Sequence, residues 1–269
     1  GSGRRGQLNF TRARALRKPR ATGDFHDPGE FELLRKIGLI GGMSWLSTRT
    51  YYEHINRMVQ ARAGLGASAP LLIESLDYAS LSRLSGAEEW QRAAGVLADS
   101  ARRLEQAGAT ALLIGANAMH KVYDQVAGAV SVPVLHIAEC VAARMADKGV
   151  KKAALIGTRN VMLEGFYRQK LIARDIELLP PEMQFVETLD RIIYDELMQG
   201  RASRQAEREL KTILTNLQQD GAEAVVLGCT ELEMIVDVDA NVLPIYDCTR
   251  IHAQAAVDWI MGDWIMGEG

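Results

Sequence analysis

LEQAGATALLIGAN (104–117) and LQQDGAEAVVLGCT (217–230) share one pattern, and that pattern decides the fold. Each stretch has a helix end, a glycine turn, and an aliphatic run that stops at Gly, a small residue and a polar residue. Matched order and spacing along the rest of the chain indicate a duplicated αβ unit. Two further pairs match at a nearly constant offset: RKIGLIGG (35–42) with KKAALIGT (151–158), and SVPVLHIAE (131–139) with NVLPIYDCT (241–249).

Short aliphatic runs alternate with stretches of helical period from residue 36 onwards. Runs bounded by Gly, Pro or polar residues are typical of buried parallel strands. Amphipathic spacing that ends on a glycine is typical of helices. Alternating strands and helices produce parallel sheets with right-handed crossovers. The expected strands of the first half are 36–42, 70–76, 111–117 and 132–138, and the expected helices are 47–62 and 88–108.

We therefore predict an α/β fold with two similar, pseudo-symmetric domains, mainly parallel sheets and an active site between the domains. The first domain comprises residues 36–132 plus 245–262, and the second comprises 133–244. A last helix at 249–261 is expected to pack back on the first domain. The remaining segments are a basic leader, tag or disordered arm at 1–35 and a tail at 263–269.

The charge of the chain is distributed unevenly. Residues 1–23 contain seven of the 31 Lys and Arg residues and no acid, so the remainder sets 24 basic against 34 acidic residues. That balance argues against nucleic-acid binding by the folded part. No apolar run approaches the roughly 18–20 residues of a membrane helix. Three cysteines without a CxxC spacing argue against a disulfide frame and a zinc site. We expect a cytoplasmic protein, with organelle targeting by the leader as the alternative.

Small and polar residues follow the expected strands where open parallel sheets bind ligands, beyond the carboxyl ends of the strands. Asn117, Thr158 and Thr230 are able to hold a carboxylate, and helix capping is the alternative for each of them. If the two halves face each other across a pseudo-twofold axis, Ala116 and Cys229 lie on opposite walls of one cleft.

Cys229 is the candidate reactive group. It follows a strand at an expected helix start, where backbone N–H groups and the helix dipole favour a thiolate. A buried structural cysteine is the alternative. We interpret Cys140 and Cys248 as packing residues and His120 as a structural residue. Lys170 is either solvated or close enough to contact a distal anion.

The stretch IGLIGGMSW places two adjacent glycines, Gly41 and Gly42, after a strand. It lacks the full GxGxxG spacing, and no acidic residue ends a second strand about 20 positions later, which disfavours a dinucleotide site. Adjacent glycines do suit the close approach of a small anion to backbone N–H groups.

Four motifs together resemble the cofactor-independent aspartate/glutamate racemase family, in the branch with GGMSW near the N-terminus. They are IGLIGGMSW, GANAMHK, IGTRNVM…FYRQKL and GCTEL. The resemblance runs from about Lys36 to Met261, with the motifs in the right order. It implies a homodimer, an aspartate or glutamate substrate, and catalysis without pyridoxal phosphate or a metal.

The resemblance also implies roles for single residues. In the family pattern, one cysteine from each half takes or returns the Cα proton. Cys229 is then the second-half acid/base, and Ala116 occupies the position of the other proton carrier. The implied substrate-binding residues are Met43, Ser44, Asn117, Ala118, Met119, Thr158, Lys170 and Thr230.

Ala116 departs from the family pattern, because alanine has no exchangeable proton. Ala118 also replaces the usual Thr after Asn117. We therefore expect an amino-acid racemase whose turnover is reduced, one-sided or water-assisted. The alternatives are a one-thiol decarboxylase or lyase of the same superfamily and an amino-acid-binding homologue without catalysis.

Overall fold

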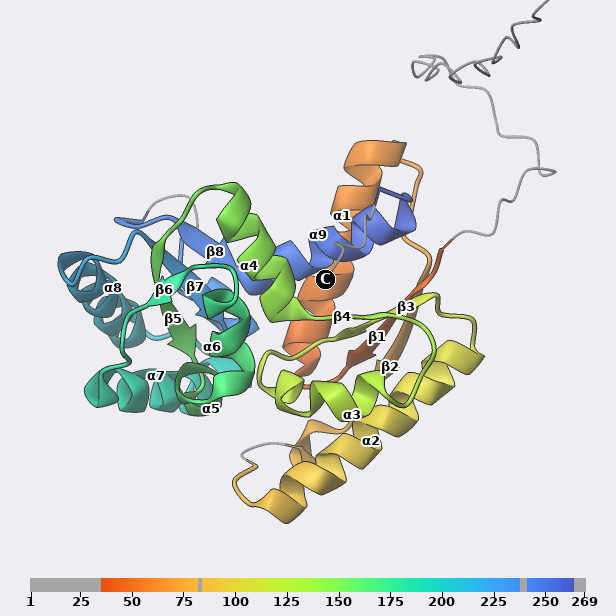
Figure 1. Ribbon diagram of the computed structural model, residues 1–269, viewed down its shortest axis with the longest axis horizontal. Helices are drawn as coiled ribbons and strands as arrows, with labels where there is room; N and C mark the ends of the chain where they lie inside the picture. The colour runs from red at the N-terminus through yellow and green to blue at the C-terminus, as the bar shows by residue number, and fades with distance from the viewer. Residues whose placement is uncertain (1–34, 82–83, 238–240, 264–269) are drawn as a thin grey trace, which may run out of the picture. The chain divides into compact units, whose positions relative to one another are not determined.

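The computed structural model describes residues 35–81, 84–237 and 241–263. The predictions for the basic leader and for the tail therefore concern residues that lie almost wholly outside the described ranges. The described chain forms two four-stranded parallel sheets, each covered by helices (Figure 1). The predicted α/β class and the parallel strand arrangement are confirmed.

The first sheet has the strand order β2-β1-β3-β4. All of its pairs are parallel, with Ile37 opposite Leu71 on one side and opposite Ala111 on the other. Each strand lies inside one of the four predicted aliphatic runs. The strands are β1 (Ile37–Gly41), β2 (Leu71–Ser75), β3 (Ala111–Ile114) and β4 (Val134–Leu135).

The second sheet repeats this topology with the order β6-β5-β7-β8. Its central strands, β5 and β7, pair in parallel in the same way as β1 and β3. The internal repeat in the sequence therefore corresponds to a repeat in strand order. The strands are β5 (Lys152–Gly157), β6 (Glu177–Leu178), β7 (Ala224–Gly228) and β8 (Ile245–Asp247).

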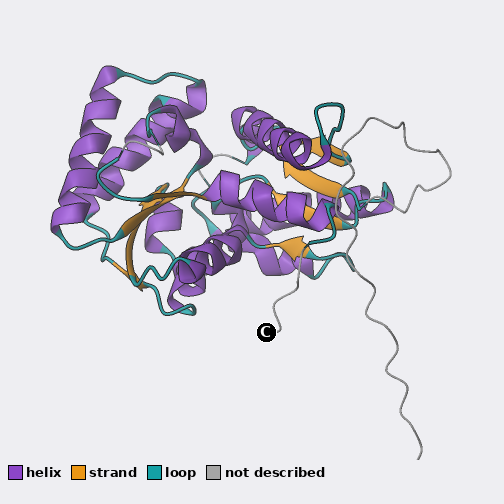
Figure 2. Ribbon diagram, turned by 90° about the horizontal axis from the view of Figure 1, so that it is seen from above, coloured by secondary structure: helices purple, strands orange, loops and turns teal. Residues whose placement is uncertain are grey.

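Helices cover both faces of each sheet, and the alternating side chains of the strands explain why (Figure 2). In the first sheet, Leu39 and Leu113 pack against α1 and α9, whereas Ile40 and Leu112 pack against the α2 side. Strands that are buried on both faces must be apolar throughout, as the sequence shows. The helices are α1 (Trp45–Ala63), α2 (Ala87–Gln106), α3 (Tyr123–Ala127), α4 (Ile137–Asp147), α5 (Arg159–Leu163), α6 (Gly165–Ile172), α7 (Met183–Asp195), α8 (Arg204–Gln219) and α9 (Cys248–Ile260).

Helix α2 illustrates how local sequence sets these boundaries. At its start, Glu89 Oε2 accepts hydrogen bonds from the backbone N–H groups of Ser85 and Gly86, at 2.8 and 3.0 Å. This acidic cap satisfies donors that the first helical turn leaves free. At its end, Gly108 adopts a left-handed φ of 94°, a conformation that costs glycine little. The predicted helix at 88–108 is thus confirmed within two residues at each end.

Helix α9 packs against α1 and α4, which confirms the predicted return of the last helix to the first half. Its apolar face, with Ala253, Ala256 and Val257, lies on the buried side of β1 and β3. By sheet membership, β4 belongs with the first half and β8 with the second. The predicted domain boundaries, at 132/133 and 244/245, fall just before β4 and β8. The division into domains stays a prediction.

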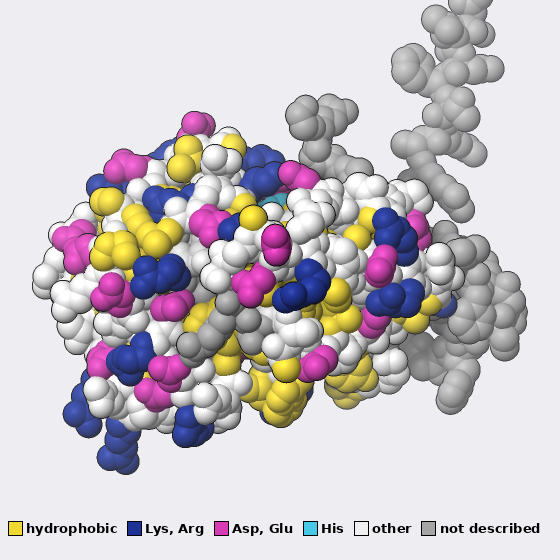
Figure 3. Space-filling model, turned by 90° about the horizontal axis from the view of Figure 1, so that it is seen from below, with side chains coloured by type: hydrophobic (Ala, Val, Ile, Leu, Met, Phe, Trp, Pro, Cys, Tyr) yellow, Lys and Arg dark blue, Asp and Glu magenta, His cyan; other side chains and the backbone are white. Residues whose placement is uncertain are grey.

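The surface mixes charges of both signs. On the face shown in Figure 3, Lys and Arg side chains are interspersed with Asp and Glu. Several of the surface charges are paired, for example Arg62 with Asp258 at 2.6 Å and Lys121 with Glu164 at 2.7 Å. Among the described residues, no helix has both the length and the apolar character needed to cross a membrane.

Candidate functional site

A cavity lies where the two halves of the chain meet, beyond the carboxyl ends of β1, β3, β5 and β7. Its volume is about 40 Å³. Ala116 and Cys229 line this same cavity, as the repeat predicts. Eight of the ten predicted site residues line it: Met43, Ala116, Asn117, Ala118, Met119, Thr158, Cys229 and Thr230.

Cys229 directly follows β7 and precedes a short 3₁₀ turn, η4 (Thr230–Met234), rather than the α-helix that we expected. Its side chain is buried, with 4% of its surface exposed, and its Sγ donates to Glu231 Oε2 at 3.1 Å. Burial raises the pKa of the thiol well above its ordinary value, and the charge of Glu231 raises it further. The backbone N–H groups of Glu231 and Leu232 lower the pKa of the thiol, as we expected, but desolvation and the neighbouring carboxylate outweigh them, so the thiol rests protonated.

Glu231 is a site residue that the sequence reasoning missed. Its Oε1 accepts hydrogen bonds from the hydroxyls of Ser44, at 2.7 Å, and Ser47, at 2.8 Å. Its side chain also lines the cavity and is buried. Glu231 belongs to the GCTEL motif, and both serines follow the adjacent glycines of the IGLIGGMSW motif. The sequence shows these two motifs separately. Their contact spans more than 180 positions and carries no signal in a single sequence.

Ser44 does not line the cavity. Its hydroxyl caps α1 by accepting from the backbone N–H of Ser47 at 3.4 Å, in addition to its contact with Glu231. Gly42 has a φ of 85°, and a Cβ there would overlap the backbone of Leu76. Its N–H donates to Thr48 Oγ1 at 2.7 Å. The adjacent glycines thus allow a close backbone crossing. The N–H of Gly42 is already used, and the interpretation of this turn as an anion site stays a prediction.

Asn117 and Thr158 carry polar groups without partners. Both side chains are buried, and the Asn117 amide and the Thr158 hydroxyl make no hydrogen bond with the described residues. Neither side chain caps the helical turn that follows it, which removes the capping alternative for these two residues. A buried polar group without a partner costs about 1–3 kcal/mol. Two such groups lining one cavity indicate a polar ligand or ordered water between them.

Thr230 is the third polar residue from the predicted set. Its Oγ1 accepts a hydrogen bond from the hydroxyl of Thr249 at 3.0 Å. A hydroxyl has one donor and two acceptor positions, so the Thr230 O–H is free to donate toward the cavity that it lines.

Lys170 is not brought into this group. It lies on α6 and does not line the cavity, and its Nζ is 2.5 Å from Glu139 Oε1 in an ion pair near the surface. Cys140 and Cys248 also lie outside the cavity lining, in agreement with the packing interpretation. The Sγ of Cys248 is 2.7 Å from the Tyr167 hydroxyl in the core of the second half.

His120 supports the loop that carries Ala116. The backbone N–H of Ile137 donates to its Nε2 at 3.2 Å, so the proton resides on Nδ1, which donates to the Ala116 carbonyl at 3.0 Å. Burial lowers the pKa of His120 to about 4, which keeps it neutral. These contacts are those of a structural residue, as expected.

The rest of the cavity lining is mostly apolar and aromatic. The Tyr78 hydroxyl donates to Met198 Sδ at 3.2 Å, and burial raises the Tyr78 pKa above its ordinary value. None of the described lining residues is Lys or Arg, so neutral donors would have to hold an anionic ligand here. The apolar lining residues beyond the predicted set are Tyr78, Leu81, Leu84, Trp90, Tyr194 and Met198.

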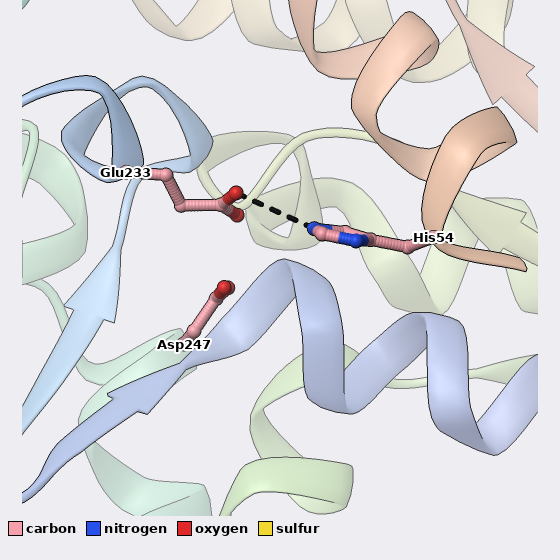
Figure 4. A group of neighbouring side chains, drawn as sticks. All are labelled: His54, Glu233 and Asp247. Atoms are coloured by element: carbon pink, nitrogen blue, oxygen red, sulfur yellow. Dashed lines mark hydrogen bonds and ion pairs between the residues drawn. The ribbon is translucent and has the colours of Figure 1, made fainter. Parts of the chain in front are cut away.

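A second titratable group lies outside the cavity lining, where α1, η4 and the start of α9 meet (Figure 4). His54 Nε2 is 3.4 Å from Glu233 Oε2, and the ligand atoms of His54, Glu233 and Asp247 lie within 4.8 Å of one another. The hydrogen bond with Glu233 raises the pKa of His54. Burial and the charge of Glu233 raise the pKa of Asp247 to about 7. His54, Glu233 and Asp247 could together hold a metal ion. The prediction of metal-free catalysis concerns the cavity, and it stays a prediction.

The fold and the cavity define the class of protein: a duplicated parallel α/β chain with a cavity, lined by a thiol, between its two sheets. The particular family follows from comparison with known proteins. The family model of the Asp/Glu/Hydantoin racemases matches residues 40–256, and the chain belongs to this family.

Individual relatives agree with this assignment. A putative Asp/Glu racemase from Yersinia pestis has 37% sequence identity and a TM-score of 0.78, with 84% of this chain and 99% of that chain covered. An aspartate racemase homologue from Pyrococcus horikoshii OT3 has 30% identity and a TM-score of 0.74 over the same shares. The broad specificity amino-acid racemase RacX of Bacillus subtilis is 22% identical over 232 residues, which are 82% of this chain and 96% of RacX. The resemblance on which the sequence reasoning relied is thus confirmed.

Proposed function

We propose that the protein is an amino-acid racemase that moves the Cα proton of aspartate or glutamate with Cys229 as acid/base and without a cofactor. One observation carries the proposal: a buried thiol shares a small cavity with two buried polar side chains, Asn117 and Thr158, that have no partner among the described residues. An α-amino acid offers a carboxylate for these donors and a Cα–H bond for the thiol.

The substrate carboxylate would lie between the Asn117 amide, the Thr158 hydroxyl and the Thr230 hydroxyl. Removing the Cα proton sends negative charge toward this carboxylate. Donors whose positions the fold fixes stabilise such charge without having to reorient when it develops. Met43, Ala118 and Met119 would shape the pocket around the substrate. Because Lys170 is paired with Glu139, a role for it in holding a distal carboxylate requires that this exposed pair open.

Ala116 limits the reaction that this site can perform. Inversion needs a proton carrier on each face of Cα, and the methyl group of Ala116 cannot be one. With Cys229 alone, a proton removed from one face returns to the same face. We therefore propose that the chain exchanges the α-proton of one enantiomer faster than it inverts that enantiomer.

Deuterium exchange tests this function. The protein is incubated in D₂O with each enantiomer of aspartate and of glutamate, and Cα deuteration and chirality are measured in the same samples. Deuteration of one enantiomer without equal inversion is expected, and Cys229→Ala should abolish it. Full inversion at the rate of a two-thiol family member would contradict the assigned role of Ala116. A chain that binds an amino acid but exchanges nothing would be a binding homologue.

A one-thiol decarboxylase is the second candidate, and the apolar lining favours it. Decarboxylation produces the carbanion by releasing carbon dioxide, so one thiol is enough to protonate it. An apolar surface around Tyr78, Leu81 and Trp90 suits a departing neutral molecule better than a charged one. Release of carbon dioxide from an aryl-substituted malonate, abolished by Cys229→Ala, would favour this reaction over racemisation. The homodimer and the cytoplasmic location stay predictions.

A further inference from the structure

Glu231 separates two hollows. On one side it lines the cavity that contains Cys229, and on the other it lines an outer hollow of about 580 Å³. Only Ser47, Thr230 and Glu231 line both, among the residues that the structure describes. The outer hollow is bounded by exposed residues that include Trp45 and Arg49. The carboxylate therefore lies between the thiol and the outer hollow.

Three donors converge on this carboxylate. Ser44 and Ser47 donate to Oε1, and Cys229 donates to Oε2. An ionised carboxylate is an acceptor only, so three donors on its two oxygens match the ionised form. The serines occupy Oε1, so Oε2 is the oxygen that faces the thiol. The resting pair is a neutral thiol beside a carboxylate, with a total charge of −1.

That pairing addresses a difficulty in the proposed chemistry. A base at Cys229 must be a thiolate, yet burial and the charge of Glu231 oppose its formation. A second net negative charge in this buried space would be costly. Transfer of the thiol proton to Glu231 avoids that cost, because it moves the charge without adding to it.

We propose that Glu231 is the proton relay of Cys229, an inference that rests on the proposed function. In the first step the S–H bond breaks, an O–H bond forms on Oε2, and sulfur keeps the electron pair. In the second step the thiolate takes the Cα proton: the C–H bond breaks, an S–H bond forms, and carbon keeps the electron pair. The Glu231 carboxyl then exchanges its proton with water in the outer hollow beside Ser47. Because the thiol and the carboxyl are now both protonated, they also exchange their protons with each other across the 3.1 Å contact. The S–H group then carries a solvent-derived proton, and the reverse of the second step delivers this proton to the carbanion.

Thiol alkylation tests the proton pair without any substrate. Iodoacetamide modification of Cys229 is followed across pH 5–10 by peptide-resolved mass spectrometry, with Cys140 as the internal reference. Glu231→Gln keeps the shape and removes the charge, so the alkylation midpoint should move toward acid and the rate at pH 7 should rise about tenfold, the effect of about one pKa unit. Glu233→Gln is the matched control, because Glu233 lies in the same turn but bonds His54, and its midpoint should not move. An unmoved midpoint in folded Glu231→Gln overturns the inference.

Cα deuteration tests the relay itself. General acid–base groups contribute about 100-fold or more, so Glu231→Gln should lose about that factor in exchange although its thiol alkylates faster. Glu231→Asp, which retains a carboxylate, should recover most of the loss. If Glu231→Gln fails to fold, Ser47→Ala is the second variant. It should slow Cα deuteration about tenfold. A residue with a merely structural role would slow both measurements together.

The two proposals fail in different ways. If alkylation shifts but exchange in Glu231→Gln equals that of the unmodified protein, the relay is wrong and the racemase proposal survives. If the unmodified protein exchanges no amino acid, the proposed function fails, and the alkylation midpoint alone decides whether Glu231 and Cys229 share a proton.

Discussion

Three buried histidines should make the protein acid-labile, and His252 is the member best suited to a test. Its Nε2 donates to the Leu135 carbonyl at 2.9 Å, and Tyr51 donates to its Nδ1 at 2.8 Å. Burial, helped by nearby His120, lowers the pKa of His252 to about 3. Similar burial lowers the pKa of His120 to about 4 and of His136 to about 2. Each therefore stays neutral in the folded chain at a pH where the unfolded chain binds a proton.

The sign and size follow from proton linkage. Below its unfolded pKa of about 6.5, His252 binds a proton only in the unfolded state, so the free energy of unfolding falls as pH falls from about 6.5 toward 3. Between pH 6.5 and 5 this loss is about 2 kcal/mol for one histidine. Asp247 acts in the opposite direction, because a carboxyl whose pKa is raised to about 7 stabilises the folded chain on the acid side. The absolute pH dependence is therefore a sum, and only a difference between variants isolates His252.

His252→Gln retains an N–H donor for Leu135 but no longer titrates. Urea unfolding at pH 7 and pH 5 should show the acid-induced loss of unfolding free energy reduced by about 2 kcal/mol relative to the unmodified protein. His54→Gln is the control of opposite sign. The raised pKa of His54 gives stability that is present below pH 6.5 and lost as pH rises, so this variant should lose more stability at pH 5. Equal pH dependence in all three proteins would refute the reasoning.

Two further predictions concern the cavity, and a third concerns the turn that follows β1. Ala116→Cys or Ala116→Thr should restore a proton carrier on the second face of Cα, so the rate of inversion should rise toward the rate of Cα deuteration. Chiral chromatography measures the inversion. An unchanged rate of inversion would contradict the assignment of this position. Asn117→Ala removes two unpaired polar atoms, so the free energy of unfolding should stay constant or rise by about 1 kcal/mol, while substrate affinity measured by calorimetry falls about tenfold. A large loss of stability would show that Asn117 is structural. Gly42→Ala should destabilise the protein by more than about 1 kcal/mol, because the left-handed backbone and the crossing with Leu76 exclude a Cβ. Thermal unfolding measures this loss of stability. A neutral result would mean that the turn relaxes.

Part of this protein follows from local sequence alone. Periodicity of apolar residues predicts strands and helices because burial of one face or both faces is written into neighbouring positions. The internal repeat then predicts two matched sheets, and the rule that ligands bind at carboxyl ends of strands brings Ala116 and Cys229 to one cavity. The structure agrees on each of these points.

Other features were decided only when distant segments came together. The contact of Ser44 and Ser47 with Glu231 joins the first and second halves, and no periodicity encodes it. The same holds for the pairing of Lys170 with Glu139, which keeps that lysine out of the cavity. The protonation of Cys229 also depends on tertiary structure, because a pKa responds to desolvation and to charges that other segments supply. Chain pattern thus determined where the thiol lies, and three-dimensional packing determined that it rests protonated beside a carboxylate.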